Sequence, residues 1–231
     1  MIVVMAGLVP AIHVFSLRRK KDVDARHEAG HGGYSMPSHF NSSGHEKADL
    51  RNAALAARDA LSREQRDAAA QALAKRGLPI GLKPGAVVAG YSPIRSELDP
   101  TPLMQTLAAQ GARLALPVIT ARGQSLRFRV WHPGDRLLPG SLGIPEPSPA
   151  AAEIVPDIVL VPLAAFDRAG HRIGYGAGHY DRTLAHLRKS RGFAAIGLAF
   201  AAQEVAAVPA LQHDVALDYV LTETKVFDFR S

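Results

Sequence analysis

Short apolar runs alternate with segments of helical periodicity from residue 86 onwards, and this alternation constrains the fold more than any other feature of the sequence. Runs such as AVVAGY (86–91) and DIVLVPL (157–163) are almost continuously apolar, which is typical of strands buried on both faces of a sheet. The predicted strands are 86–91, 113–119, 126–131, 157–163, 194–200 and 218–223, and the helices predicted among them are 102–110 and 180–189. The alternation predicts an α/β fold of three layers, α/β/α, with a mostly parallel central sheet.

Two further helices are predicted before the first strand, and we expect these N-terminal helices to pack on the sheet. Helical patterning begins at Glu46, and a second helix follows at 63–75. Ser62 and Gln65 have the spacing of a capping box at the start of the second helix, and Gly77 follows its end. We therefore expect a single domain over 46–231.

The first 45 residues lack the pattern of a folded domain, and we expect residues 1–45 to form a poorly ordered extension. The apolar start is shorter than the ~20 residues of a membrane span, and basic residues follow it rather than precede it as in a secretory signal. Residues 20–46 are rich in His, Gly, Ser and Asn, which is typical of a linker.

The composition narrows the classes of partner. The chain has no cysteine, which excludes disulfides and thiolate metal sites and is compatible with a reducing cytoplasm. The formal net charge of +6 favours anionic partners: nucleic acid, a membrane surface or small anions such as nucleotides. An aromatic fraction of only 6% offers few stacking platforms for nucleic acid.

The segment HRIGYGAGHYDRTL (171–184) carries the strongest local signal. Three alternating glycines followed by a helix N-terminus can expose main-chain amides to an anion, usually phosphate. Arg172 would add a fixed cation, and Asp181 beside a phosphate suggests an intervening Mg²⁺. An ordinary glycine turn with an acid in the first helical turn is an equally good reading of this segment alone. Neither the Rossmann nor the Walker spacing is present.

A basic stripe on the first predicted helix favours the anion-binding interpretation. At 100° per residue, Lys47, Arg51 and Arg58 fall within about 40° of one another. The same helix is crowded with alanines, which suggests close packing: Ala53, Ala54, Ala56 and Ala57. A basic stripe that packs closely requires an anionic partner.

Several motifs, in this order, resemble those of the 5-formyltetrahydrofolate cyclo-ligase family, also called methenyltetrahydrofolate synthetase. They are the K-x-x-x-R pair (Lys47, Arg51), GYSPIRSELD (90–99), GIPEP (143–147), RIGYGAGHYDRTL (172–184) and QHDVALDYVLTE (212–223). The similarity covers about 46–227 and identifies 46–231 as a catalytic domain of this kind.

The resemblance implies an ATP- and Mg²⁺-dependent ligase that cyclises 5-formyltetrahydrofolate to 5,10-methenyltetrahydrofolate and releases ADP and phosphate. A phosphorylated formyl intermediate is expected on the path. The implied partners are ATP and the folate, including its polyglutamylated forms, with no nucleic acid and no membrane. The implied protein is cytoplasmic, and a monomer is favoured.

The resemblance also implies site residues. Arg172, Tyr180 and Asp181 match catalytic positions, and Asp181 and Asp214 match the acids that hold Mg²⁺. The implied ATP contacts are Lys47, Arg51, Arg172, Ile173, Gly174, Tyr175, Gly176, Ala177, Gly178, His179 and Tyr180. The implied folate contacts are Ser92, Glu97, Gly143, Ile144 and Glu146.

Three positions depart from the family pattern. His179 stands where a tyrosine is usual; an imidazole can still donate a hydrogen bond and stack, but it can also carry charge. Tyr175 and Ala177 stand where some relatives have basic residues, which suggests fewer phosphate contacts and weaker ATP binding.

Two other functions remain to be compared with this one. His27, Glu28 and His31 spell the H-E-x-x-H of zinc proteases, but the neighbouring glycines oppose the helix that such a site needs. The second alternative is a non-catalytic protein that binds a nucleotide or a sugar phosphate. Such a sensor would bind ATP without turning it over.

Overall fold

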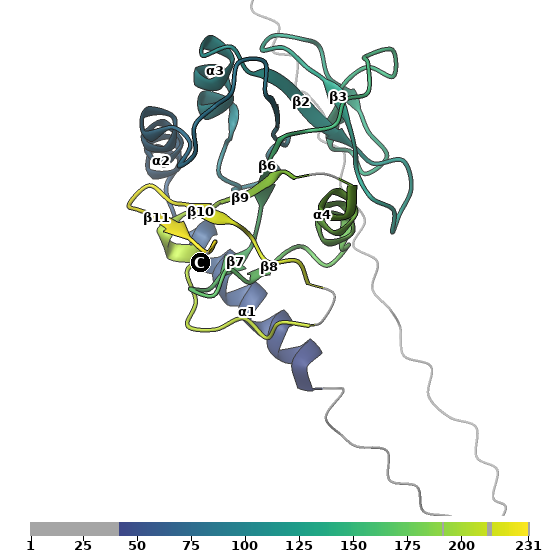
Figure 1. Cartoon of the computed structure of the whole chain (residues 1–231). Helices are drawn as coiled ribbons and strands as arrows, with labels where there is room; N and C mark the ends of the chain where they lie inside the picture. Colours follow the sequence, from purple (N-terminus) through teal and green to yellow (C-terminus); the bar gives the residue numbers. More distant parts are fainter. Residues whose placement is uncertain (1–41, 191, 212–213, 231) are drawn as a thin grey trace, which may run out of the picture. The chain divides into compact units, whose positions relative to one another are not determined.

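The computed structural model describes residues 42–190, 192–211 and 214–230, which belong to one compact unit (Figure 1). The apolar start of the chain and the H-E-x-x-H pattern lie outside the described residues. Among the residues that are described, no helix combines the length and apolar character that crossing a bilayer would demand.

A seven-stranded sheet forms the centre of this unit, in the order β11-β10-β9-β6-β1-β2-β3. Its strands are β1 (Val87–Ala89), β2 (Arg113–Val118), β3 (Arg127–Val130), β6 (Ile158–Pro162), β9 (Ala194–Leu198), β10 (Tyr219–Leu221) and β11 (Val226–Asp228). The five inner strands pair in parallel, and only the two edge strands, β3 and β11, are antiparallel. The prediction of a mostly parallel sheet is confirmed.

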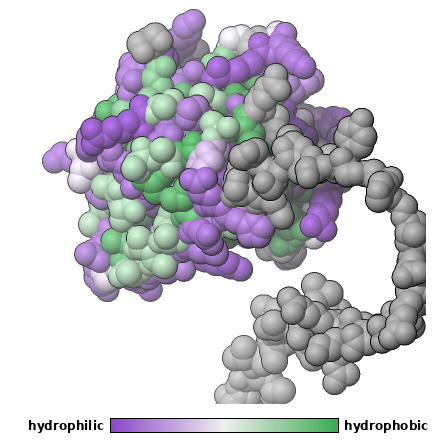
Figure 2. Space-filling model, turned by 90° about the horizontal axis from the view of Figure 1, so that it is seen from below, coloured by the Kyte–Doolittle hydropathy of each residue, from purple (hydrophilic) through white to green (hydrophobic). Residues whose placement is uncertain are grey.

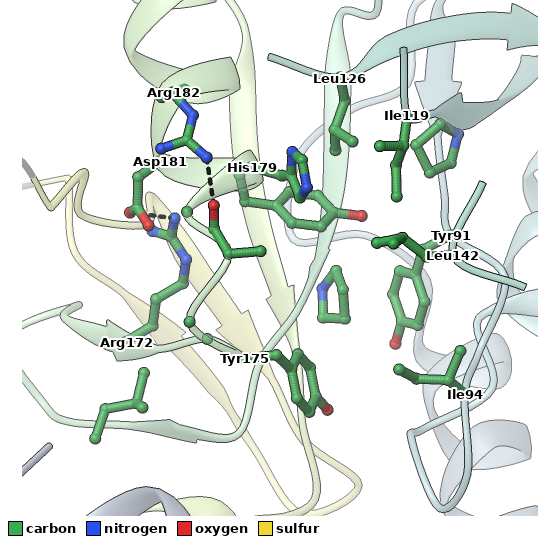
Figure 3. A pocket seen from close by; sticks show the side chains of 18 of the residues that line it. Tyr91, Ile94, Ile119, Leu126, Leu142, Arg172, Tyr175, His179, Asp181 and Arg182 are labelled. Carbon is green, nitrogen blue, oxygen red and sulfur yellow. Dashed lines mark hydrogen bonds and ion pairs between the residues drawn. The ribbon is translucent and has the colours of Figure 1, made fainter. Parts of the chain in front are cut away.

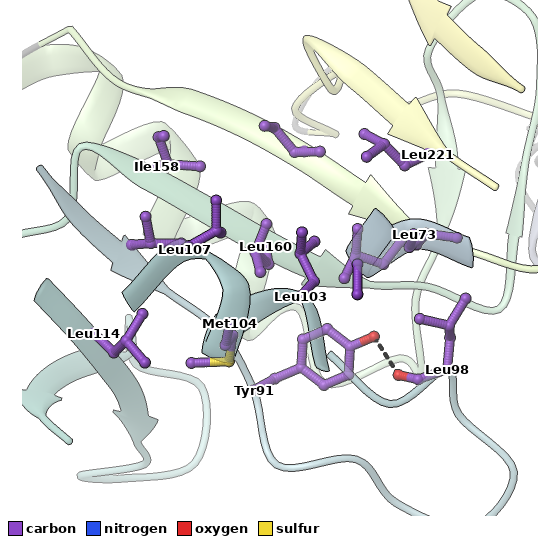
Figure 4. Packing of buried hydrophobic residues seen from close by; sticks show 14 of the residues in the cluster. Leu73, Tyr91, Leu98, Leu103, Met104, Leu107, Leu114, Ile158, Leu160 and Leu221 are labelled. Atoms are coloured by element: carbon purple, nitrogen blue, oxygen red, sulfur yellow. Dashed lines mark hydrogen bonds between the residues drawn. The ribbon is translucent and has the colours of Figure 1, made fainter. Parts of the chain in front are cut away.

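Helices cover both faces of the sheet and make the three layers of Figure 1. They are α2 (Arg63–Arg76) and α3 (Thr101–Ala109) on one face and α4 (His179–Ser190) on the other. Alternate residues of each strand enter opposite layers: Val88 and Leu160 pack with α2 and α3, as Figure 4 shows for Leu160, and Val87 and Val159 pack with α4. Burial on both faces explains why the strands are almost continuously apolar.

The sequence signals at the two ends of α2 predicted the position of this helix correctly. Ser62 accepts from the Gln65 amide at 3.2 Å, and the Gln65 side chain accepts from the Ser62 amide at 2.8 Å, which completes the predicted capping box. The helix ends at Gly77, whose φ of 74° is easily adopted only by glycine.

Helix α1 (Ser42–Asp59) differs from the prediction in two ways. It begins four residues before Glu46, and it packs against a two-stranded hairpin and a short 3-10 helix rather than against the central sheet. That hairpin consists of β7 (Ala165–Phe166) and β8 (Arg172–Ile173), and the 3-10 helix, η2, is Ala201–Gln203. Of the four alanines thought to mark close packing, only Ala54 is buried.

The hairpin, η2, the edge strand β11 and a second small sheet were not predicted. The second sheet pairs β4 (Leu138–Pro139) with β5 (Pro145–Glu146), between the predicted strands 126–131 and 157–163. The strands β4, β5, β7 and β8 have two residues each, which is too short to show a periodicity of their own.

The order of the strands defines where a ligand can enter. From β1 the chain passes through α3 to β2 and β3 on one side, and it then returns to β6 on the other side of β1. The connections therefore diverge beyond the carboxyl ends of β1 and β6, and in open α/β sheets such a switch point is the usual place for a ligand.

We predict that Gly197→Ala destabilises the protein, because this buried strand position has no room for a side chain. An added Cβ would lie 2.7 Å from Leu217, 2.8 Å from Leu163 and 2.9 Å from Val220. Overpacking of this kind costs about 1–3 kcal/mol, measured as the free energy of unfolding in urea.

The control for that substitution is Gly192→Ala, since Gly192 is exposed and an added Cβ would meet nothing within 4 Å. Equal stabilities of the two variants would show that the α4 face of the sheet is less tightly packed than described.

Candidate active site

A pocket of about 890 Å³ lies at the switch point, beyond the carboxyl ends of β1, β2 and β6. Tyr91 and Ser92 follow β1, Ile119 follows β2, and Pro162 ends β6. The glycine loop and the start of α4 form its opposite wall (Figure 3). The pocket thus joins segments that are far apart in the sequence.

The pocket brings together all but one of the predicted site residues. The predicted residues that line it are Lys47, Arg51, Ser92, Glu97, Ile144, Glu146, the whole run from Arg172 to Tyr180, Asp181 and Asp214. Gly143 does not line it, although its neighbour Ile144 does.

One end of the pocket is built from paired charges. Asp181 accepts from Arg172 Nη2 at 2.6 Å, and Asp214 accepts from Lys47 Nζ at 2.5 Å. Arg172 is buried, and it also donates to the main-chain carbonyl of Val215. Both carboxylates and both cations therefore surround one polar region, with each charge balanced by a neighbour.

The glycine loop runs along this polar end. Gly176 and Gly178 have φ of 94° and 64°, which explains the need for glycine at these two positions. Arg51 Nε donates to the Gly174 carbonyl at 2.8 Å and so holds the loop to α1. Helix α4 begins at His179, and the main-chain amides of a first helical turn have no partners within their helix. This arrangement suits an anion.

The other end of the pocket is mostly apolar. Its side chains come from the loop after β1, from the end of β2 and the loop that follows it, and from the β4–β5 region: Ile94, Pro117, Ile119, Leu126, Leu142 and Ile144. Two hydrogen bonds fix the predicted folate residues here: Ser92 Oγ donates to the Pro145 carbonyl at 2.7 Å, and Glu146 accepts from the Ile119 amide at 3.1 Å.

Several large apolar side chains are exposed at this pocket. Leu142 is 59% exposed, and Tyr175 and Leu211 are also exposed; all three line the pocket. Figure 2, which views the protein from below, shows apolar residues on this face of the surface, with polar residues interspersed among them. Exposed apolar groups concentrated at a pocket favour a ligand with apolar surface.

Glu97 lines the pocket and is only 9% exposed. Its carboxylate accepts from the Ile94 amide at 2.9 Å. Burial raises the pKa of Glu97 above the usual 4.5, and the Ile94 amide, Tyr175 and Arg58 only partly oppose this. A buried carboxylate with spare acceptor capacity is well suited to bind N–H groups of a ligand.

His179 lines the pocket, and a hydrogen bond holds one side of its ring. Its Nδ1 lies 2.8 Å from the Gln124 carbonyl oxygen, and because a carbonyl only accepts, Nδ1 carries the hydrogen. Its buried Nε2 has no hydrogen-bond partner within the described part of the chain. In the neutral ring, this nitrogen offers an acceptor at the pocket wall.

Tyr180 keeps its proton in this site. Burial, followed by the nearby Glu97, raises the pKa of its phenol. The hydroxyl of Tyr180 is therefore available as a hydrogen-bond donor.

Some lining residues were not predicted, and most of them are apolar. They are Tyr91, Ile94, Pro117, Ile119, Leu126, Leu142, Pro162, Arg182, Ala185 and Leu211. One sequence signal could have revealed three of them. Tyr91, Ile119 and Pro162 lie at or next to the carboxyl ends of predicted strands, and the carboxyl ends of parallel strands converge at one edge of a sheet.

The acids of the polar end are compatible with a magnesium ion. Magnesium prefers oxygen ligands and usually takes only one or two carboxylates, with water and substrate phosphates completing its shell. Asp181 and Asp214 supply two carboxylates to one pocket. Over the described ranges no three His, Asp or Glu side chains converge, so a complete all-protein metal cage is absent there.

Comparison with known proteins identifies one family. The sequence model of the 5-formyltetrahydrofolate cyclo-ligase family matches residues 43–223. The 5-formyltetrahydrofolate cyclo-ligase of Mycolicibacterium smegmatis is 38% identical over 187 residues, which cover 76% of this chain and 93% of that protein. The protein of the same name from Escherichia coli K12 is 33% identical over 180 residues, covering 74% and 97%.

Solved structures give the same result. The NMR structure of Aquifex aeolicus 5,10-methenyltetrahydrofolate synthetase superimposes with a TM-score of 0.68 and 30% identity, over 80% of this chain and 93% of that one. The synthetase of Mycoplasma pneumoniae has a TM-score of 0.61 over 77% of this chain and 99% of its own. Its 24% identity supports a shared fold alone.

We predict that Glu97→Gln changes how stability depends on pH. Because burial raises the pKa of Glu97, its contribution to stability is fully present below the usual 4.5 and is lost as the pH rises through the folded-state pKa. Glutamine removes this titration. The variant should therefore gain stability relative to the wild type between pH 4 and pH 8, measured by urea unfolding.

The matched control is Glu46→Gln on the exposed surface of α1. Its pH profile should run parallel to that of the wild type. A parallel profile for Glu97→Gln as well would mean that the carboxyl group is hydrated in solution.

Proposed function

Because the chain belongs to the 5-formyltetrahydrofolate cyclo-ligase family, we propose that its pocket holds ATP and 5-formyltetrahydrofolate together, with the glycine loop beside the reacting groups. The protein is an ATP-dependent ligase that converts 5-formyltetrahydrofolate to 5,10-methenyltetrahydrofolate and releases ADP and phosphate.

The reaction proceeds in two steps. The formyl oxygen is a poor leaving group, so it first accepts the γ-phosphoryl group of ATP, and ADP departs. N10 of the folate then attacks the activated formyl carbon, a C–N bond forms, and the C–O bond breaks to release phosphate. Aligning donor with acceptor and excluding water from the phosphorylated intermediate are the main tasks of the protein.

The polar end is proposed to bind the triphosphate. The glycine loop and the first turn of α4 offer main-chain amides, and Lys47, Arg51 and Arg172 offer fixed cations. Lys47 and Arg172 are now paired with Asp214 and Asp181. Phosphate oxygens would take over these cations as partners, which leaves the two carboxylates available to a cation that accompanies the nucleotide.

Asp181 and Asp214 are proposed to hold that cation, Mg²⁺. When bound, Mg²⁺ would neutralise charge on the phosphate oxygens during transfer. Arg172 would also stabilise the transition state, because its buried guanidinium would neutralise negative charge that develops on the transferred phosphoryl group. Tyr180 would donate from its neutral hydroxyl.

The apolar end is proposed to bind the folate. Ile94, Ile119 and Leu142 offer surface to a flat ring system, and the buried carboxylate of Glu97 offers acceptors for ring N–H groups. Ser92, Ile144 and Glu146 line the same end, and Gly143 is proposed to shape the turn beside them. Polyglutamylated folates, with their added negative charge, would suit the net charge of +6.

One observation carries this proposal: a charged anion-binding end and an apolar end meet in a single pocket at the glycine loop. We also propose that the enzyme acts in the cytoplasm as a monomer.

The test is spectrophotometric, and it includes Asp181→Asn. With 5-formyltetrahydrofolate, ATP and Mg²⁺, the wild type should produce the near-ultraviolet absorbance of methenyltetrahydrofolate. Asp181→Asn should lower kcat by about 100-fold, since a charge-stabilising contact that matters most in the transition state is lost. The KM for the folate should change much less.

Asp228→Asn is the matched control, because Asp228 is exposed and pairs with Arg230 on an edge strand. Tight ATP binding by the wild type without any absorbance change would instead favour the sensor. Equal rates for Asp181→Asn and the wild type would exclude the metal role of Asp181.

We propose that the catalytic unit is 46–231 and that residues 1–45 are an extension outside it. Deleting residues 1–41 should leave kcat and both KM values within about twofold. Deleting residues 1–52, which removes Lys47 and Arg51, should abolish activity. Loss of activity in the shorter deletion, with unchanged thermal unfolding, would place a functional residue in the extension.

A further inference from the structure

Tyr175 of the glycine loop contacts residues from other parts of the chain. It leaves the loop between Gly174 and Gly176 and extends toward the segment that carries Ile94 (Figure 3). Its hydroxyl accepts a hydrogen bond from Arg58 Nη1 of α1. The hydroxyl also interacts with Glu97. Although Tyr175 is 39% exposed, desolvation of its hydroxyl, followed by the charge of Glu97, raises the pKa of the phenol.

Arg58 is the centre of this contact. It is only 2% exposed, and its Nε donates to Ser96 Oγ at 3.0 Å. Ser96 in turn donates to Asp59, and the Arg58 guanidinium lies 5.8 Å from the centre of the Tyr175 ring. A buried cation is costly unless hydrogen bonds hold it, so the partners of Arg58 are fixed in place by their joint contacts.

These contacts connect the two ends of the pocket. Ser96 and Glu97 belong to the segment after β1, at the proposed folate end, and Tyr175 belongs to the loop at the proposed nucleotide end. Arg58 and Arg51 lie on the same helix, and Arg51 holds the carbonyl of Gly174, next to Tyr175. Arg58 and Tyr175 therefore link the segment that carries Ser96 to the glycine loop through direct contacts.

The backbone on both sides of Tyr175 is permissive. Gly176 has a φ of 94°, and an added Cβ at Gly174 or Gly176 would meet nothing within 4 Å. Sterics therefore do little to fix this part of the loop, which is held by hydrogen bonds instead. Arg58 donates to the Tyr175 hydroxyl, Arg51 to the Gly174 carbonyl and Arg182 to the Ala177 carbonyl.

We propose that Tyr175 is a positioning residue that couples the two halves of the site, so that folate binding at the Ser96–Glu97 segment orders the glycine loop for ATP. This inference rests on the proposed function, since it assumes both substrates. Coupling between two sites is reciprocal, so ATP must favour folate binding by the same factor.

The experiment measures this coupling factor directly. Calorimetry would give the Kd of a non-hydrolysable ATP analogue with Mg²⁺, with and without saturating 5-formyltetrahydrofolate. In the wild type the folate should tighten the analogue about tenfold, a usual size for coupled sites. In Tyr175→Phe, which keeps the ring and removes the hydroxyl, this factor should fall to near one and kcat should fall.

The matched control is Tyr219→Phe. The hydroxyl of Tyr219 is buried, has no hydrogen-bond partner in the described chain and lies outside the pocket. The same chemical change there should leave the coupling factor and kcat unchanged. Thermal unfolding of all three proteins shows whether any variant is misfolded.

The outcomes separate this inference from the function on which it rests. An unchanged coupling factor in Tyr175→Phe overturns the inference, and so does an absence of coupling in the wild type. If Tyr175→Phe binds one ligand more weakly but keeps the coupling factor of the wild type, the inference is also overturned. Tyr175 would then only contact that ligand and would not couple the two sites. Turnover by the wild type, followed by absorbance in the same buffer, tests the function independently.

Discussion

Parallel pairing of β1 with β2 on one side and β6 on the other is the constraint on which the rest of this structure depends. Val88 of β1 is in register with Leu114 and with Ile158, so a strand buried on both faces is also paired along both edges. Its carboxyl end can only continue out of the sheet. Because the chain diverges there, the pocket is formed by segments that leave the sheet in different directions.

The charges in that pocket are balanced before any substrate arrives. Asp214 with Lys47 and Asp181 with Arg172 form ion pairs whose partners are both partly or largely buried. Cations left unpaired in such a place would pay a large desolvation cost. A pre-paired site avoids that cost, and it keeps each cation oriented toward the position where phosphate oxygens are proposed to replace the carboxylate.

Glu97 illustrates the opposite compromise, in which a buried carboxyl group is kept at some cost to stability. Burial raises the pKa of Glu97 even though Arg58 and Tyr175 lie beside it. No apolar residue could serve as an acceptor for ring N–H groups, so the proposed role in folate binding explains why a carboxylate stands there. Strain and uncompensated charge are typically concentrated at functional sites.

Features that depend on near neighbours in the chain could be predicted from the sequence alone. They are the capping box of Ser62 and Gln65, the apolar strands and the glycine loop before α4. The sequence also placed a basic stripe on α1 and, through its motifs, the family. Three contacts could be seen only in the folded chain. Helix α1 packs on the β7–β8 hairpin, Lys47 donates to Asp214, which is 167 residues away in the sequence, and Arg58 donates to the Tyr175 hydroxyl. The reason is physical: local patterns follow from backbone preferences and periodicity within a few residues, whereas these contacts arise only when the packed sheet brings distant segments together.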